Sequence, residues 1–88
     1  MNVSKVIINR MGRDNKGNVN SAEATVYFAP GFFGVRNEPR EAFSTGTCEF
    51  WYWLDSGMSI WQDEVRDRLI GALRVELYKE KQARKENA

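Results

Sequence analysis

The chain lacks histidine and has a single cysteine, Cys48, among its 88 residues. One thiol excludes an internal disulfide. Without imidazole or paired thiols the usual zinc ligand sets are missing, and so is the side chain that most often serves as general acid or base. These absences argue against an enzyme and give no reason to expect a catalytic residue, a metal or a cofactor.

Two further patterns are missing. Gly12 and Gly17 fall in a predicted hairpin and not between a strand and a helix, so the chain has no glycine-rich phosphate loop. No apolar run reaches the roughly 18 residues of a membrane span, and no basic-then-apolar leader is present. We therefore expect a cytoplasmic protein without membrane contact.

An excess of charge of either sign is also missing. Thirteen Lys and Arg residues against twelve Asp and Glu residues give a formal net charge of +1. Nucleic-acid-binding domains usually carry a basic excess, and mimics of DNA would carry a strong acidic one. Bulk charge therefore does not select a partner, and the length leaves room for one domain with a modest core.

The residues that are present predict an α+β fold. Residues 4–11 are rich in β-branched side chains and residues 14–18 in turn formers. Residues 19–29 then alternate, which predicts a β-hairpin over 1–29 with one apolar side formed by Ala22, Ala24, Val26 and Phe28. Residues 47–55 predict a further strand, and 30–46 a loop or a short edge strand near 32–36. Together they favour an antiparallel sheet of three to four strands.

A long helix is predicted over 59–84, followed by a frayed tail over 85–88. Ser59 and Gln62 have the spacing of a capping box, and acidic residues follow where the helix dipole favours them. An apolar residue recurs every four positions and predicts the side that packs on one face of the sheet: Trp61, Val65, Leu69, Leu73 and Leu77. Both faces of residues 47–55 are largely apolar, so the pattern does not tell which sheet face the helix covers.

A second, narrower stripe lies roughly opposite on the helix and comprises Ile60, Gly71, Val75 and Tyr78. Glycine inside a helix costs about 1 kcal/mol relative to alanine, so Gly71 indicates that another element approaches closely. One alternative is a homodimer contact through this stripe. The other is that the segment 30–46 packs there.

Aromatic and arginine residues are the candidates for partner binding, because they dominate interface energetics. Two indoles share one side of the strand 47–55, and two phenylalanines stand between glycines in the segment 30–46. Either group can instead be core, beneath the helix or plugging one end. The predicted partner-binding residues are Trp51, Trp53, Phe32, Phe33, Arg36 and Arg40.

In size, in its lack of catalytic residues and in its hairpin-then-helix order, the chain resembles small phage or mobile-element accessory proteins, including inhibitors of host defence such as anti-CRISPR proteins. The resemblance implies a non-catalytic inhibitor or adaptor that binds another protein or protein complex. A single-stranded nucleic-acid binder that stacks bases on sheet aromatics is one alternative. A structural assembly subunit is another.

Overall fold

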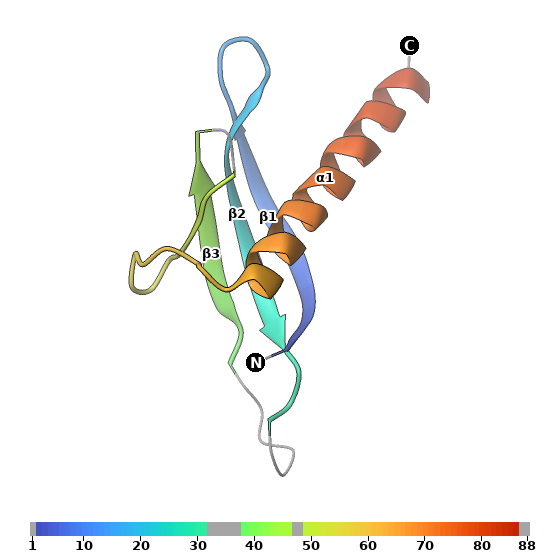
Figure 1. Ribbon diagram of the computed structural model, residues 1–88. Helices are drawn as coiled ribbons and strands as arrows, with labels where there is room; N and C mark the ends of the chain where they lie inside the picture. Colours follow the sequence, from blue (N-terminus) through green and yellow to red (C-terminus); the bar gives the residue numbers. More distant parts are fainter. Residues whose placement is uncertain (1, 32–37, 47–48, 87–88) are drawn as a thin grey trace.

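The computed structural model describes residues 2–31, 38–46 and 49–86. It confirms the α+β prediction: four antiparallel strands in the order β1-β2-β3-β4 form one sheet, and the C-terminal helix α1 packs on one of its faces (Figure 1). The elements are β1 Val3–Arg13, β2 Val19–Phe28, β3 Arg40–Thr45, β4 Trp51–Trp53 and α1 Asp63–Glu86. No helix in the described part of the chain has the length and apolar character needed to cross a membrane.

The first hairpin forms where the sequence predicts it. The Asp14 carboxylate accepts hydrogen bonds from the backbone N–H groups of Lys16 (2.9 Å) and Asn18 (3.0 Å) and so replaces backbone partners within the turn. Gly17 supplies the left-handed conformation that the turn needs, with φ of 84°. Beyond it, β1 and β2 pair along almost their whole length.

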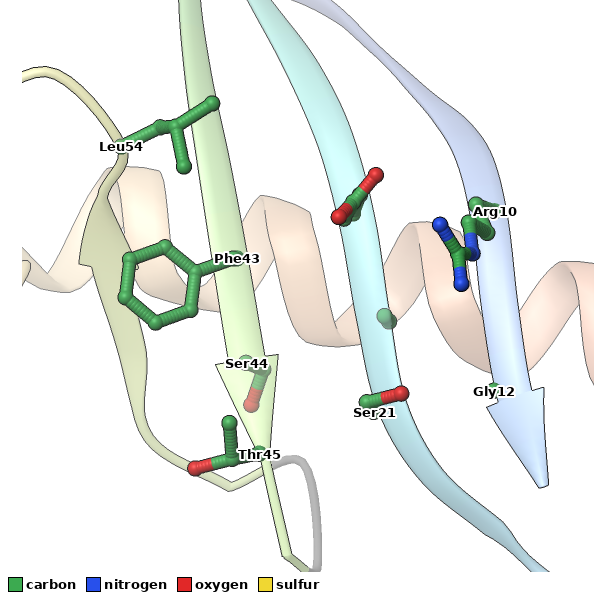
Figure 2. A pocket seen from close by; sticks show the side chains of 9 residues that line it. Arg10, Gly12, Ser21, Phe43, Ser44, Thr45 and Leu54 are labelled. Carbon is green, nitrogen blue, oxygen red and sulfur yellow. The ribbon is translucent and has the colours of Figure 1, made fainter.

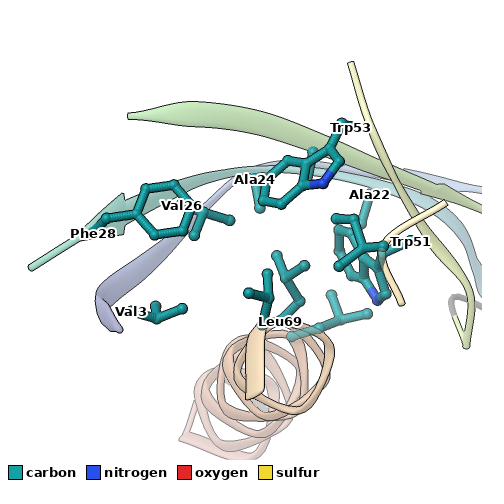
Figure 3. Close-up of a cluster of buried hydrophobic side chains, with 12 residues drawn as sticks. Val3, Ala22, Ala24, Val26, Phe28, Trp51, Trp53 and Leu69 are labelled. Carbon is teal, nitrogen blue, oxygen red and sulfur yellow. The ribbon is translucent and has the colours of Figure 1, made fainter. Parts of the chain in front are cut away.

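Strand alternation then divides the sheet into two faces. The β2 residues Ala22, Ala24, Val26 and Phe28 share one side, as predicted, and the structure shows that this side is buried beneath α1. Val65, Leu69 and Leu73 of α1 meet them from the other side and belong to the same buried cluster. The alanine side chains in the middle of the sheet are small, so they leave space between the sheet and the helix for larger aromatic rings (Figure 3).

The segment 30–46 does contain a strand, within the part that the structure describes. The strand is β3, at Arg40–Thr45, and it lies inside the sheet between β2 and β4. The region around 32–36 lies outside the described residues. Of the described residues in the predicted strand 47–55, only Trp51–Trp53 form a strand. At the other end, α1 continues to Glu86, so the first two residues of the predicted frayed tail 85–88 are helical, and the other two lie outside the described residues.

The start of the helix differs from the prediction. Residues 58–60 run back along β4: the Trp53 N–H donates to the Met58 carbonyl (2.9 Å), and the Ile60 N–H donates to the Trp51 carbonyl (2.8 Å). These hydrogen bonds keep residues 58–60 extended, so α1 begins at Asp63 and the predicted capping box does not form. In consequence Ile60 is buried in the core, while Trp61 is 74% exposed and not a core residue.

Candidate interaction surface on the open sheet face

The two tryptophans predicted to bind a partner lie inside the protein. Trp51 is 1% exposed and Trp53 is also buried, between the sheet and α1 (Figure 3). Their rings fill the space that Ala22 and Ala42 leave beneath the helix. The prediction that these two indoles form an exposed docking surface is therefore wrong, because the helix covers the face of the sheet on which they stand.

Arg40, another predicted partner-binding residue, is already engaged within the chain. Its guanidinium lies over the Trp53 ring, 4.0 Å from the centroid, and donates two hydrogen bonds to the carboxylate of Asp55 (2.9 and 3.2 Å). The hydrogen bond from Arg40 holds the pKa of Asp55 below its usual range. Arg40 thus closes the edge of the core. Phe32, Phe33 and Arg36 lie outside the described residues.

Within the described part of the chain no helix lies on the opposite face of the sheet, and aromatic side chains gather there. The strand register aligns Arg10, Glu23, Phe43 and Tyr52 in one row across the four strands. Phe43 and Tyr52 stack with their centroids 5.4 Å apart and an interplanar angle of 29°. This face therefore carries a preformed aromatic pair on a hydrogen-bonded strand scaffold.

The pairing of β4 with residues 58–60 extends this surface. Tyr52 is bridged to Ser59, and the Ile60 N–H donates to the Trp51 carbonyl. Phe50 and Trp61 directly follow this pairing, and we infer from strand alternation that both lie on the side of Tyr52. Phe50 is 66% exposed and Leu54 is 52% exposed. We call these side chains the aromatic patch: Phe43, Phe50, Tyr52, Leu54 and Trp61.

A pocket of about 230 Å³ borders the aromatic patch. Phe43 and Leu54 form its apolar side, and Arg10 of β1 stands across the sheet from them (Figure 2). The bottom of the pocket between them is formed by two small residues, Gly12 and Ser21, which pair across β1 and β2. A Cβ at Gly12 would collide with the Ser21 hydroxyl. The pocket has room for one apolar side chain beside the opposite charges of Arg10 and Glu23, which both line it.

The half of this face formed by β1 and β2 is mostly polar and of mixed charge, with Ile7 as an exposed apolar residue opposite Thr25. Lys5 lies over the Tyr27 ring, 4.7 Å from its centroid, and the Asn9 amide donates to the Thr25 hydroxyl (2.7 Å). Arg10 makes no ion pair with any described residue, although Glu23 is its cross-strand neighbour. An apolar area beside such a polar border is typical of a protein interface.

Sequence reasoning missed this surface for an identifiable reason. It placed Phe50, Tyr52 and Leu54 together on one side of a strand but assigned function to the opposite side, where the tryptophans are. It also left Phe43 in a segment without a defined strand. The signal that could have located the patch is the alternation of small residues in 40–45, with Ala42 and Ser44 on one side and Phe43 on the other.

The predicted second stripe of the helix is present in part. Gly71 and Tyr78 lie on the side of α1 that faces away from the sheet, whereas Val75 stands toward β1 and lines a hollow with Val6, Ile7 and Ile8; Val75 and Tyr78 are both exposed. Ile60 does not belong to the stripe because it precedes the helix and is buried.

The described residues contain no group of three or more acidic, cysteine or histidine side chains that could hold a metal ion. Comparison with known proteins found no matching family model, no matching curated protein and no matching solved structure.

Proposed function

We propose that this protein is a non-catalytic binding module that docks on another protein through the aromatic patch and thereby blocks or adapts that protein. The observation that supports this proposal is the aromatic patch itself: Phe50, Leu54 and Trp61 are all more than half exposed, beside the stacked Phe43–Tyr52 pair. A soluble monomer usually shows an apolar patch of this kind where it binds a partner.

The scaffold beneath the patch supports this role. Phe43 and Tyr52 belong to hydrogen-bonded strands, and the buried Trp51 and Trp53 fix those strands from below. Aromatic side chains on a rigid support lose little conformational entropy on binding, so more of their burial appears as affinity. The pocket beside Phe43 supplies a place for an anchoring side chain of the partner.

Charge favours a protein over a nucleic acid as the partner. Glu23 and Glu41 both stand on the open face, between its basic residues and the aromatic patch. Phosphates would meet these carboxylates wherever a base stacked on the Phe43–Tyr52 pair, and the net charge of +1 adds no general attraction. Single-stranded nucleic acid therefore remains the second candidate, favoured only by the stacked rings.

The resemblance in size and element order extends the proposal to an inhibitor from a phage or mobile element that acts on a host protein in the cytoplasm.

The test replaces two exposed members of the patch and compares them with a matched site elsewhere. The double variant Phe50→Ser with Leu54→Ser should lose the proteins that the tagged wild type captures from host lysate. The control is Met58→Ser, because Met58 is 66% exposed, as Phe50 is, but lies opposite Trp53 on the other side of the strand pair. Circular dichroism should show both variants folded.

Two results would contradict the proposal. One is that the double variant retains the captured proteins at wild-type level. The other is that the wild type binds a single-stranded oligonucleotide with an affinity that falls steeply with salt, since that dependence is the signature of phosphate contacts.

A further inference from the structure

One edge of the sheet is open. β1 is the edge strand there, and no strand in the described part of the chain pairs with its outer side. With 11 residues it is also the longest strand that the structure describes. The opposite edge is covered, because residues 58–60 hydrogen-bond to β4. A long edge strand presents a row of backbone N–H and C=O groups that can pair with a further strand.

Side chains of α1 cover this edge only at its beginning. The Val3 N–H donates to the Glu64 carboxylate (3.3 Å), and the Arg68 guanidinium donates to the Ser4 carbonyl (3.2 Å). Among the described residues, no side chain hydrogen-bonds to the backbone of residues 5–12. The middle of the edge is therefore available to a partner backbone.

A hollow lies beside the straight part of this edge. Residues 5–8 pair with β2 in one register, and register shifts flank them on both sides. The C-terminal half of α1 extends past β1 (Figure 1), and between helix and strand is a hollow of about 330 Å³. A strand added to a sheet lies about 4.8 Å from its neighbour, so it would enter this hollow. The apolar lining consists of Val6, Ile7, Ile8, Ala72 and Val75.

The charges along this stretch favour an acidic segment. Lys5 is the one charged residue within 5–8, and it forms no ion pair with a described residue. Its cross-strand neighbour is Tyr27, so no carboxylate stands opposite it on the sheet. In the hollow, the carboxylate of Glu76 is already paired with Lys79 (3.7 Å). The charge left without a counter-ion is positive, and acidic side chains on an added strand would compensate it.

The same charges disfavour a second copy of the chain at this edge. β1 contains three basic residues and no acidic one. A two-fold pair of β1 strands centred on the straight stretch would gather Lys5 and Arg10 of both copies on the same face of the joined sheet. Like charges in cross-strand positions are destabilising, so the edge selects against itself.

From these observations we propose that the outer edge of β1 binds an extended segment of another protein as a fifth strand. Apolar side chains of that segment point toward α1 and fill the hollow beside Val75. The alternate side chains are acidic and point toward the open face beside Lys5. Main-chain hydrogen bonds supply the affinity, and the hollow and the charge supply the selectivity. This second docking surface does not depend on the aromatic patch.

The probe is a blocked synthetic octapeptide in which valine and glutamate alternate, titrated into the 15N-labelled full chain at low salt. It should bind with a Kd below about 1 mM and shift the backbone amide signals of residues 5–8 and 72–79. An octapeptide in which valine and lysine alternate should bind about tenfold more weakly, because it meets Lys5 with like charge.

Val75→Asp tests the hollow, and Leu54→Asp is its matched control because both side chains are 52% exposed. Val75→Asp places a carboxylate where the valines of the peptide would pack, so it should raise the Kd by about tenfold or more. Leu54→Asp adds the same charge on the aromatic patch and should leave the Kd unchanged.

A second pair of variants keeps the test valid if Val75→Asp does not fold. Lys5→Gln should weaken binding of the glutamate peptide several-fold at low salt and have no effect near 1 M salt, where the Debye length is about 3 Å. Lys16→Gln makes the same change in the turn between β1 and β2 and should bind the peptide as the wild type does.

Several results would overturn the proposal. The first is that the glutamate peptide does not bind at about 1 mM, and the second is that the lysine peptide binds equally well. Binding that Leu54→Asp removes and Val75→Asp retains would place the peptide on the aromatic patch. Amide signals of residues 5–8 that shift with protein concentration alone would show that a second copy occupies the edge.

Discussion

Replacing Leu69 by alanine tests the central feature of the fold, which is that α1 covers the tryptophan face of the sheet. Leu69 is fully buried and belongs to the same cluster as Trp51 and Trp53. Removing three carbons from such a site costs the lost transfer free energy plus a cavity term, about 3 kcal/mol in total. A chain of 88 residues has roughly 4–13 kcal/mol of stability, so the loss is a large fraction of it.

Urea unfolding followed by tryptophan fluorescence and far-UV circular dichroism measures this loss. With a slope near 1 kcal/mol per M, as expected for a small domain, Leu69→Ala should lower the midpoint by about 3 M. Leu54→Ala is the matched control, because it is the same chemical change on the open face, where Leu54 is half exposed. It should cost less than about 1 kcal/mol.

The reasoning is refuted if the two alanine variants lose equal stability, or if Leu69→Ala costs less than 1 kcal/mol at an unchanged slope. Either result would mean that the helix does not pack on the face that carries the indoles.

Three further outcomes follow from the structure. Trp61→Phe should remove most of the acrylamide-accessible fluorescence, because Trp61 is exposed while the other two indoles are buried; unchanged quenching would contradict their burial. The hydrogen bond from Arg40 lowers the folded-state pKa of Asp55, so this pair stabilises the fold at neutral pH and the contribution is lost as the pH falls below about 4. Asp55→Asn should flatten that acid limb in a stability-versus-pH series, and an identical limb in the variant would exclude the pair as its source. Gly57→Ala should lower the free energy of unfolding by about 1 kcal/mol, because Gly57 has a φ of 72° that alanine rarely adopts. Gly71→Ala should raise the free energy of unfolding by a similar amount, because a Cβ there meets no atom and alanine favours the helix. Urea midpoints that move in the same direction in both variants would contradict these expectations.

The candidate surface shows where local patterns fail. The alternation in residues 47–55 correctly places Trp51 and Trp53 on one side of the strand and Phe50, Tyr52 and Leu54 on the other. It does not tell which of the two sides is buried. Large aromatic residues occur both in cores and in interfaces, so composition does not decide between the two. The prediction assigns the side with the two tryptophans to the partner, and the structure places the helix on that side.

The helix start fails for a related reason. A capping box stabilises a helix start by about 1 kcal/mol. Forming it at Ser59 would exclude the backbone hydrogen bonds from residues 58–60 to β4 and the burial of Ile60. Burying an isoleucine contributes more than a cap does, so the non-local arrangement prevailed. No pattern within the helix segment could reveal that β4 was available as a partner.

The sequence by itself determined the elements whose forces are local: the Asp14–Gly17 turn, the alternation of β2, and the Val65–Leu69–Leu73 side of the helix, because turn geometry and periodicity are properties of neighbouring residues. Only the tertiary structure decided which sheet face the helix covers. That choice depends on the register that brings Ala22, Ala24 and Ala42 beside one another and leaves a space of the right depth for two indoles. Such a space exists only once strands distant in sequence have paired, and it is what leaves the aromatic patch on the outside.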